Sequence, residues 1–132
     1  MHEFDIIGRY FAGIGWQGSD ALALGPGDDC GLVEVAAGDQ LCVSTDTLLA
    51  GVHFPRDADA ETVACRALAA NLSDLAAMGA SPLGFLMALT LPGADERWLA
   101  DFSETVHRLS QRHRAAVIGG NLAKGDLSVT LT

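Results

Sequence analysis

The stretch Leu41–Phe54 reads LCVSTDTLLAGVHF and organises the rest of the chain. Its first half has the alternating pattern of a β-strand, which predicts two faces, Leu41, Val43, Thr45 and Thr47 on one and Cys42, Ser44 and Asp46 on the other. A strand that becomes polar at its end delivers ligands to the rim of a sheet, where α+β folds often place their sites. A strand end followed by a capped turn is the alternative, because Ser, Thr and Asp also favour turns.

Acidic residues flank this stretch on both sides. Asp28 and Asp29 precede it, and Asp74 follows it on a predicted helix, on the same side as Asn71. Adjacent carboxylates repel each other unless a cation lies between them, and hard cations such as Mg²⁺ prefer carboxylate oxygens. A solvated Asp–Asp turn is the alternative for the first pair. Together the three positions favour a site for metal and phosphate.

Composition limits the possible partners. The chain has 132 residues, 49% of them hydrophobic, and a formal net charge of −9. This length fits one domain or a piece of one, and the hydrophobic content argues against disorder. The acidic balance predicts no nucleic-acid or membrane partner, whereas divalent cations fit and can bring a phosphorylated substrate. We find no secretory signal and no apolar stretch of the length of a membrane span.

The cysteines indicate a compartment. Cys30, Cys42 and Cys65 are odd in number and lack Cys-x-x-Cys spacing. They are predicted to be buried free thiols in a reducing cytoplasm.

Periodicity and chain breakers predict the order of elements. Helices are expected at 2–11, at 60–78 after the N-cap Asp59, and after the N-cap Asp95. Strands are expected at 30–35, 41–47, 84–91, 115–118 and 127–132, with a hairpin loop at 36–40 and a loop at 119–125. This order predicts an α+β fold, a mixed β-sheet of about four or five strands with two long helices on one face. The last strand reads as just begun, so we expect an N-terminal part of something longer.

Several strings together resemble the thiamine-monophosphate kinase family. They are Gly27-Asp28-Asp29-Cys30, Ser44-Thr45-Asp46-Thr47-Leu48, Gly51-Val52-His53-Phe54, the run NLSDLAAMGA at 71–80, and Ile118-Gly119-Gly120. They occur in the family's order and span roughly residues 4–132; the run at 71–80 is highly specific, whereas Gly-Asp-Asp alone is not. The family belongs to the AIR-synthetase-like (PurM-like) ATP-binding superfamily, whose members are longer. The resemblance therefore implies one N-terminal ATP- and Mg²⁺-binding domain, residues 1–132, without the C-terminal domain.

The resemblance also implies a reaction and an assembly. Thiamine phosphate and ATP would give thiamine diphosphate and ADP, by direct in-line phosphoryl transfer assisted by several Mg²⁺ ions. Two N-terminal domains would pair their sheets into a barrel, making a cytoplasmic homodimer.

Site residues follow from the same resemblance. The implied Mg²⁺ ligands are Asp28, Asp29, Ser44, Thr45, Asp46 and Asp74. His53 matches a thiamine phosphate contact, and Gly119, Gly120 and Asn121 match a nucleotide-contacting loop. The family pattern after Gly-Gly is Asp-Thr, so Asn121 keeps an oxygen ligand but loses the charge. No catalytic residue is assigned.

The chemistry agrees with this family. Two phosphorylated substrates bring further negative charge to an acidic chain, and in-line transfer needs positioning and neutralisation more than a strong base. We therefore predict that Asp29, Asp46 and Asp74 converge around Mg²⁺. Two alternatives are another enzyme of the superfamily, such as AIR synthetase, selenophosphate synthetase or the hydrogenase-maturation enzyme, and a non-catalytic dimerisation or metal-binding domain.

Overall fold

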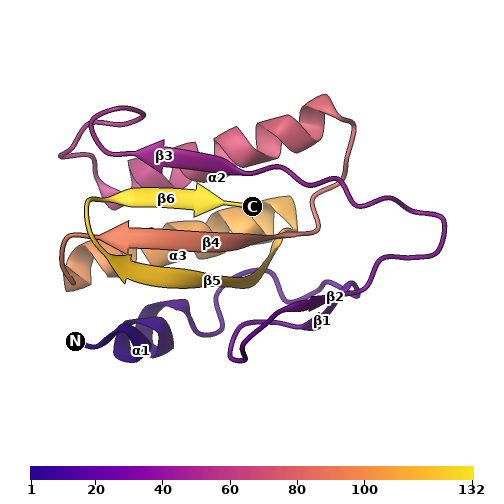
Figure 1. The fold of residues 1–132 in the computed structure, drawn as a ribbon, viewed down its shortest axis with the longest axis horizontal. Coiled ribbons are helices and arrows are strands. Elements are labelled where there is room, and N and C mark those ends of the chain that lie inside the picture. The colour runs from indigo at the N-terminus through magenta and orange to yellow at the C-terminus, as the bar shows by residue number, and fades with distance from the viewer.

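A four-stranded sheet backed by two long helices forms the body of the protein. The structure is a computed structural model describing residues 1–132. In Figure 1 the helices lie behind the sheet, which confirms the predicted α+β layer with two long helices on one face. The helices are α2 (Ala60–Ala77) and α3 (Glu96–His113), and the strands, in sheet order, are β3 (Asp46–Leu49), β6 (Ser128–Leu131), β4 (Gly84–Leu91) and β5 (Ala116–Lys124).

The sheet is mixed. β6 is antiparallel to both of its neighbours, whereas β4 and β5 are parallel and are joined through α3. β4 is an interior strand, as its continuous apolar run predicts. The register aligns Asp46, Leu131, Met87 and Gly120 in one row across the sheet.

The core lies between the sheet and the helices. Alternate strand residues point inward, and the alanine-rich face of α2 brings that helix close to them. Trp98 stacks on Phe102 with 4.9 Å between ring centroids. The core includes Leu48, Phe85, Leu89, Val129 and Leu131 from the sheet, Val63, Ala67 and Leu68 from α2, and Leu99, Phe102 and Val106 from α3.

Both predicted N-caps are present. The Asp59 carboxylate accepts a hydrogen bond from the Thr62 N–H at 2.7 Å, and the Asp95 carboxylate accepts from the N–H groups of Arg97 and Trp98. Hydrogen bonds from Thr62, first from its side chain and then from its backbone N–H, lower the pKa of Asp59.

The N-terminal segment is helical, as predicted, but the first hairpin is different. Helix α1 (Glu3–Ile6) continues into the π-helix η1 (Ile7–Phe11), and β2 (Leu32–Val33) then pairs with β1 (Leu22–Leu24) in a small second sheet. The predicted pairing of 30–35 with 41–47 is therefore wrong. Strand β3 begins only at Asp46, because it is an edge strand whose one neighbour ends at Leu131, opposite Asp46.

Strand β5 is longer than predicted. Gly119, Gly120 and Asn121 lie inside it and not in a loop. The pairing register shifts at Ile118, because Phe85 pairs with Val117 but Leu86 pairs with Gly119. Two glycines in a strand therefore mark a bulge here, one of the positions where glycine is used in sheets.

The cysteines are free, as predicted, but two of them are exposed, Cys30 and Cys42, and only Cys65 is partly buried. They were predicted to be buried, but Cys30 and Cys42 lie in the segments around β2, away from the core. No helix of the structure is both long and apolar enough to cross a membrane.

Candidate functional site

The clearest polar cluster lies where β3 begins and α2 ends. Asp46 opens β3 and lies on the same face of the strand as Leu48, toward α2, which carries Asp74 in its last turn. The Ser44 hydroxyl donates a hydrogen bond to the Asp74 carboxylate at 2.8 Å. Ser44 and Asp46 thus share a face, as the alternation of the strand pattern predicts. We refer to Ser44, Asp46 and Asp74 as the acidic cluster.

The acidic cluster has no basic partner. Burial raises the pKa of Asp46, and the charge of Asp74 and a hydrogen bond with its side chain raise it further. The two ion pairs of the protein, Arg9–Glu96 and Arg108–Glu61, involve neither residue. The last turn of α2 has no basic side chain either, and its exposed carbonyls add partial negative charge. The cluster therefore favours a cation.

Asn71 fixes this arrangement. It is buried, and its Nδ2 donates to the carbonyl oxygen of Ser44 at 3.1 Å and to that of Leu131 at 3.3 Å. The side chain joins α2 to the segment before β3 and to β6. Asn71 and Asp74 share one side of the helix, as predicted, but only Asp74 faces the site.

Thr45 faces away from the acidic cluster. Its hydroxyl pairs with that of Thr132 at 2.9 Å, and Thr47 pairs with Thr130 at 2.8 Å on the same uncovered face of the sheet. The ligand role implied for Thr45 stays a prediction.

Asp28 and Asp29 lie in the loop between β1 and β2, and both are exposed. Asp28 Oδ1 accepts a hydrogen bond from the Asp29 N–H at 2.8 Å. This geometry is that of a solvated Asp–Asp turn, the alternative to a metal site. No group of three or more His, Cys, Asp or Glu side chains is placed to hold a metal ion. Two of the three predicted carboxylates therefore come together, and the role of Asp29 stays a prediction.

Gly119, Gly120 and Asn121 are remote from the acidic cluster. Gly120 occupies the row of Asp46, but three strand spacings of about 4.8 Å separate them, about 14 Å in all. Asn121 is exposed and pairs in register with Ala88.

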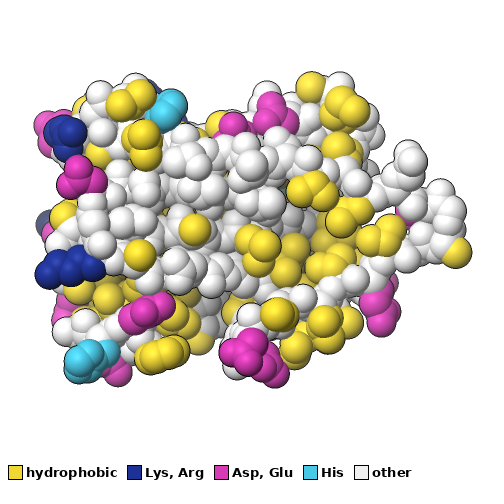
Figure 2. Space-filling model, in the orientation of Figure 1, with side chains coloured by type: hydrophobic (Ala, Val, Ile, Leu, Met, Phe, Trp, Pro, Cys, Tyr) yellow, Lys and Arg dark blue, Asp and Glu magenta, His cyan; other side chains and the backbone are white.

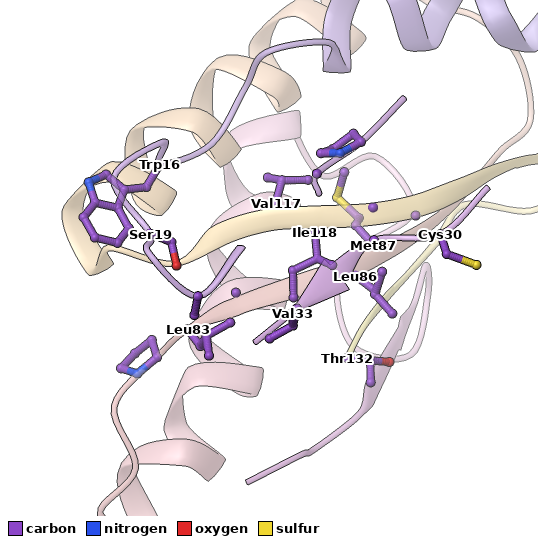
Figure 3. Close-up of a pocket in the computed structure, with 18 of the residues that line it drawn as sticks. Trp16, Ser19, Cys30, Val33, Leu83, Leu86, Met87, Val117, Ile118 and Thr132 are labelled. Carbon is purple, nitrogen blue, oxygen red and sulfur yellow. The ribbon is translucent and has the colours of Figure 1, made fainter. Parts of the chain in front are cut away.

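A broad open groove connects several predicted residues. It runs between the segment around β1 and β2 and the sheet, and Figure 3 shows Leu86, Met87, Val117 and Ile118 from β4 and β5 on one side, with Val33 and Cys30 from the β2 region also lining it. The predicted site residues that line it are Asp28, Asp29, Ser44, Gly119, Gly120 and Asn121. The groove thus offers an apolar surface with polar groups at its borders.

His53 follows the other end of β3. Asp46 and Leu49 are three residues apart along the strand, about 10 Å. The His53 Nδ1 accepts a hydrogen bond from the Leu49 N–H at 2.9 Å, and the His53 carbonyl accepts one from Arg66 Nη1 at 2.7 Å. Sequence reasoning missed Arg66, because the contact joins two residues 13 positions apart and no sequence pattern indicates it.

His107 on α3 contacts the loop that follows the N-terminal helix. Its Nδ1 accepts a hydrogen bond from the Gly15 N–H at 3.0 Å, and Ser110 accepts one from the Trp16 N–H at 2.7 Å. These contacts fasten the N-terminal loop to α3 and are structural.

The mixed sheet, the two helices behind it and the carboxylates at its edge define an α+β domain with an acidic site. The sequence profile of the AIR synthase related protein, N-terminal domain, matches residues 27–132. The chain belongs to this family.

Individual relatives point to one kind of enzyme within this family. The chain is 47% identical over 129 residues to thiamine-monophosphate kinase of Escherichia coli K12, covering 98% of this chain and 39% of that protein. The thiamine-monophosphate kinase structure from Stenotrophomonas maltophilia K279a has a TM-score of 0.78 at 45% identity, covering 85% of this chain and 35% of that one. A structure of AaThiL complexed with AMPPCP and TMP has a TM-score of 0.61 at 35% identity. The match covers 67% of this chain and 30% of that one. The chain spans about two fifths of the length of the curated relatives.

Proposed function

We propose that this chain is the ATP- and Mg²⁺-binding N-terminal domain of a thiamine-phosphate kinase. The enzyme would transfer the γ-phosphoryl group of ATP to thiamine phosphate, giving thiamine diphosphate and ADP. The identity to the Escherichia coli enzyme supports this proposal, as does the similarity to AaThiL in a complex with AMPPCP and TMP.

The acidic cluster carries the proposal. Its oxygens, the Asp46 and Asp74 carboxylates and the Ser44 hydroxyl, are ligands of the kind that Mg²⁺ prefers, and the absence of a basic partner leaves their charge uncompensated. The donor set therefore fits the ion. When bound, Mg²⁺ supplies charge neutralisation and orientation for the transferred phosphoryl group.

The protein side chains then have positioning roles. Ser44 orients the Asp74 carboxylate, and Asn71 holds the backbone of Ser44 against α2. No general base is needed, because the phosphate of thiamine phosphate is already anionic and in-line transfer depends mainly on alignment and electrostatics.

The groove is the proposed nucleotide site. Its apolar surface suits a purine ring, and Gly119 and Gly120 on β5 let the ligand approach the backbone. Asn121 would offer an amide oxygen where the family pattern has a carboxylate. Asp28 and Asp29, which line the same groove, would add ligands for further Mg²⁺ ions.

The proposed assembly is a homodimer in which the uncovered sheet face is buried. The middle of this face carries uncharged side chains, and charged ones lie around its edge (Figure 2). Its residues outside the groove include Thr47 and Leu49, both exposed on β3. The free, partly exposed cysteines agree with a cytoplasmic location.

A kinase assay on a full-length protein carrying this domain tests the function. We expect thiamine phosphate to be phosphorylated in the presence of ATP and Mg²⁺, and Asp74→Asn to lower the rate by two orders of magnitude or more, roughly the range of a lost electrostatic catalytic contact. Asp101→Asn, an exposed position on α3, is the matched control. Turnover of other phosphorylated substrates, with none of thiamine phosphate, would instead assign the chain to another enzyme of the superfamily.

The chain by itself has a second candidate function. It spans about two fifths of the length of its curated relatives, so alone it would act as a metal-binding and dimerisation domain. Mg²⁺ binding without phosphoryl transfer by the 132-residue chain is the expected result.

A further inference from the structure

Trp16 is a large aromatic residue that does not belong to the core. Its neighbour Ile14 packs against the core, as does Trp98, the other tryptophan of the chain, which stacks on Phe102. Trp16 neither packs against the core cluster nor has an aromatic partner. It lines the groove instead, and Figure 3 shows it with Ser19 at one end. Core packing therefore does not account for a half-buried tryptophan at this position.

Hydrogen bonds to α3 hold the backbone that carries Trp16. The Trp16 N–H donates to Ser110 Oγ at 2.7 Å, and Ser110 is fully buried. The preceding Gly15 N–H donates to His107 Nδ1 at 3.0 Å. A Cβ on Gly15 would be 2.7 Å from Val117 Cγ2, so this segment also lies directly against β5. The position of Trp16 is therefore set before any ligand binds, which lowers the entropic cost of binding.

Gly18 holds the indole ring of Trp16. A Cβ on Gly18 would be 2.6 Å from Trp16 Cζ2 and 2.8 Å from Trp16 Cε2. The backbone at Gly18 thus lies against the ring and leaves no room for a side chain. Because the side chain is half-buried and lines the groove, part of the ring stays open to a ligand there.

The groove continues from Trp16 to the glycines of β5. Gly15 lies against Val117, and Gly120 follows Val117 by three residues along the strand, about 10 Å. A nucleotide carries its planar base at one end and its charged phosphates at the other. A base on Trp16 would therefore direct the phosphates toward Gly119 and Gly120, which line the same groove.

We propose that Trp16 is a stacking platform for the base of the nucleotide that enters the groove. The inference rests on the proposed function, because it takes the groove as the nucleotide site. It adds a residue outside the family match, which begins at residue 27. Stacking on an aromatic ring uses the π-face that every nucleobase has, so Trp16 contributes affinity for the base and little discrimination among bases. Gly18 and Ser110 are positioning residues for the ring.

Tryptophan fluorescence tests the platform, because Trp16 and Trp98 are the two tryptophans of the 132-residue chain. In Trp98→Phe, where Trp16 alone emits, ATP with Mg²⁺ should quench the emission in a saturable manner. Tripolyphosphate with Mg²⁺, which has the phosphates without the base, should leave the emission unchanged. In Trp16→Phe, where Trp98 alone emits, ATP should cause no quenching.

Equilibrium dialysis with ATP and Mg²⁺ measures the affinity. Trp16→Ala should weaken ATP binding about tenfold, as expected for the loss of one base-stacking contact, whereas Trp16→Phe keeps a ring and should retain most of the affinity. Gly18→Ala should also weaken binding, because its methyl group displaces the indole. Gly8→Ala, whose Cβ would meet nothing within 4 Å, is the matched control and should bind like the wild type.

Three results would overturn the proposal. They are wild-type affinity of Trp16→Ala for ATP, equal quenching of Trp16 by ATP and by tripolyphosphate, and the absence of ATP binding by the wild-type chain.

The failure of this inference is distinguishable from failure of the kinase assignment. A full-length Trp16→Ala enzyme that phosphorylates thiamine phosphate with an unchanged KM for ATP would remove the platform and leave the kinase standing. Saturable quenching of Trp16 by ATP, in a protein that does not phosphorylate thiamine phosphate, would leave the platform standing and remove the kinase.

Discussion

At the scale of single residues, the carboxylates of the acidic cluster lower the stability of the metal-free protein and favour cation binding. Two carboxylates, Asp46 and Asp74, lie near each other without a basic partner, and Ser44 and Asn71 hold them there. Such an arrangement costs stability in the metal-free protein, because burial and then the nearby charge of Asp74 make ionisation of Asp46 unfavourable. The raised pKa of Asp46 therefore makes a prediction about stability and pH.

Asp46→Asn should stabilise the metal-free chain at neutral pH. The pKa of Asp46 is higher in the folded than in the unfolded state, so the penalty appears as the pH rises through the ordinary value of 3.8 and is complete above the raised pKa. We expect a gain on the order of 0.5 kcal/mol, since solvent screens a partly exposed pair. Below the ordinary value the gain should vanish.

Denaturant unfolding with a chelator present, at neutral and at acid pH, measures this effect. Asp101→Asn on α3 serves as the control for charge alone. A loss of stability for Asp46→Asn at neutral pH would show that the carboxylate is stabilising without metal, contrary to our interpretation of the cluster.

At the scale of elements, β5 explains most of the difference between prediction and structure. The Gly-Gly pair is typical of a turn by local pattern, but the strand continues to Lys124 because β4 supplies partners along its whole length. A Cβ on Gly120 would overlap the Met87 carbonyl oxygen, whereas one on Gly119 would meet only Leu86 Cδ2 at 3.4 Å. Close approach to the Met87 backbone therefore requires glycine at 120, whereas no steric contact requires it at 119.

Gly120→Ala should destabilise the chain by about 2–3 kcal/mol, because a rigid backbone group would have to move. Gly119→Ala is the matched control, and it should be near neutral or slightly stabilising through the unfolded state. Thermal unfolding of both variants measures the difference. Equal midpoints for the two would contradict the register that places Gly120 opposite Met87.

The helices and the interior strand were predictable from sequence for physical reasons. Asp59 and Asp95 are N-caps followed by amphipathic runs, and the continuous apolar run at 84–91 fits an interior strand. The predicted hairpin of 30–35 with 41–47 is wrong, since local pattern does not say which partner a strand takes. Within the site, strand alternation predicts that Ser44 and Asp46 share a face, and the Ser44 hydroxyl reaches Asp74 there. The hydrogen bond from Arg66 to the His53 carbonyl joins residues 13 positions apart and is not predictable from local pattern.

At the scale of the whole molecule, charge is distributed unevenly. One face of the sheet is covered by α2 and α3, and the other presents hydroxyl and apolar side chains without a charge in its middle (Figures 1 and 2). A chain with a net charge of −9 that leaves this face uncharged is suited to pairing with a second copy there.

Light scattering tests this pairing. The wild-type chain should have the mass of a dimer, and Thr47→Lys, which puts a charge on this face, should give a monomer, because an unpaired charge is costly to bury. Ala69→Lys, on the exposed side of α2, should remain a dimer. Monomeric wild-type protein, or dimeric Thr47→Lys, would contradict the assignment of this face.

The central claim is that the acidic cluster binds Mg²⁺, and calorimetric titration of the 132-residue chain tests it most directly. We predict saturable Mg²⁺ binding that Asp74→Asn abolishes. Ser44→Ala should weaken it roughly tenfold, as expected for loss of a hydrogen bond that orients a ligand. Asp101→Asn should leave the isotherm unchanged. Superimposable isotherms for the wild type and Asp74→Asn would show that the cluster is not the metal site.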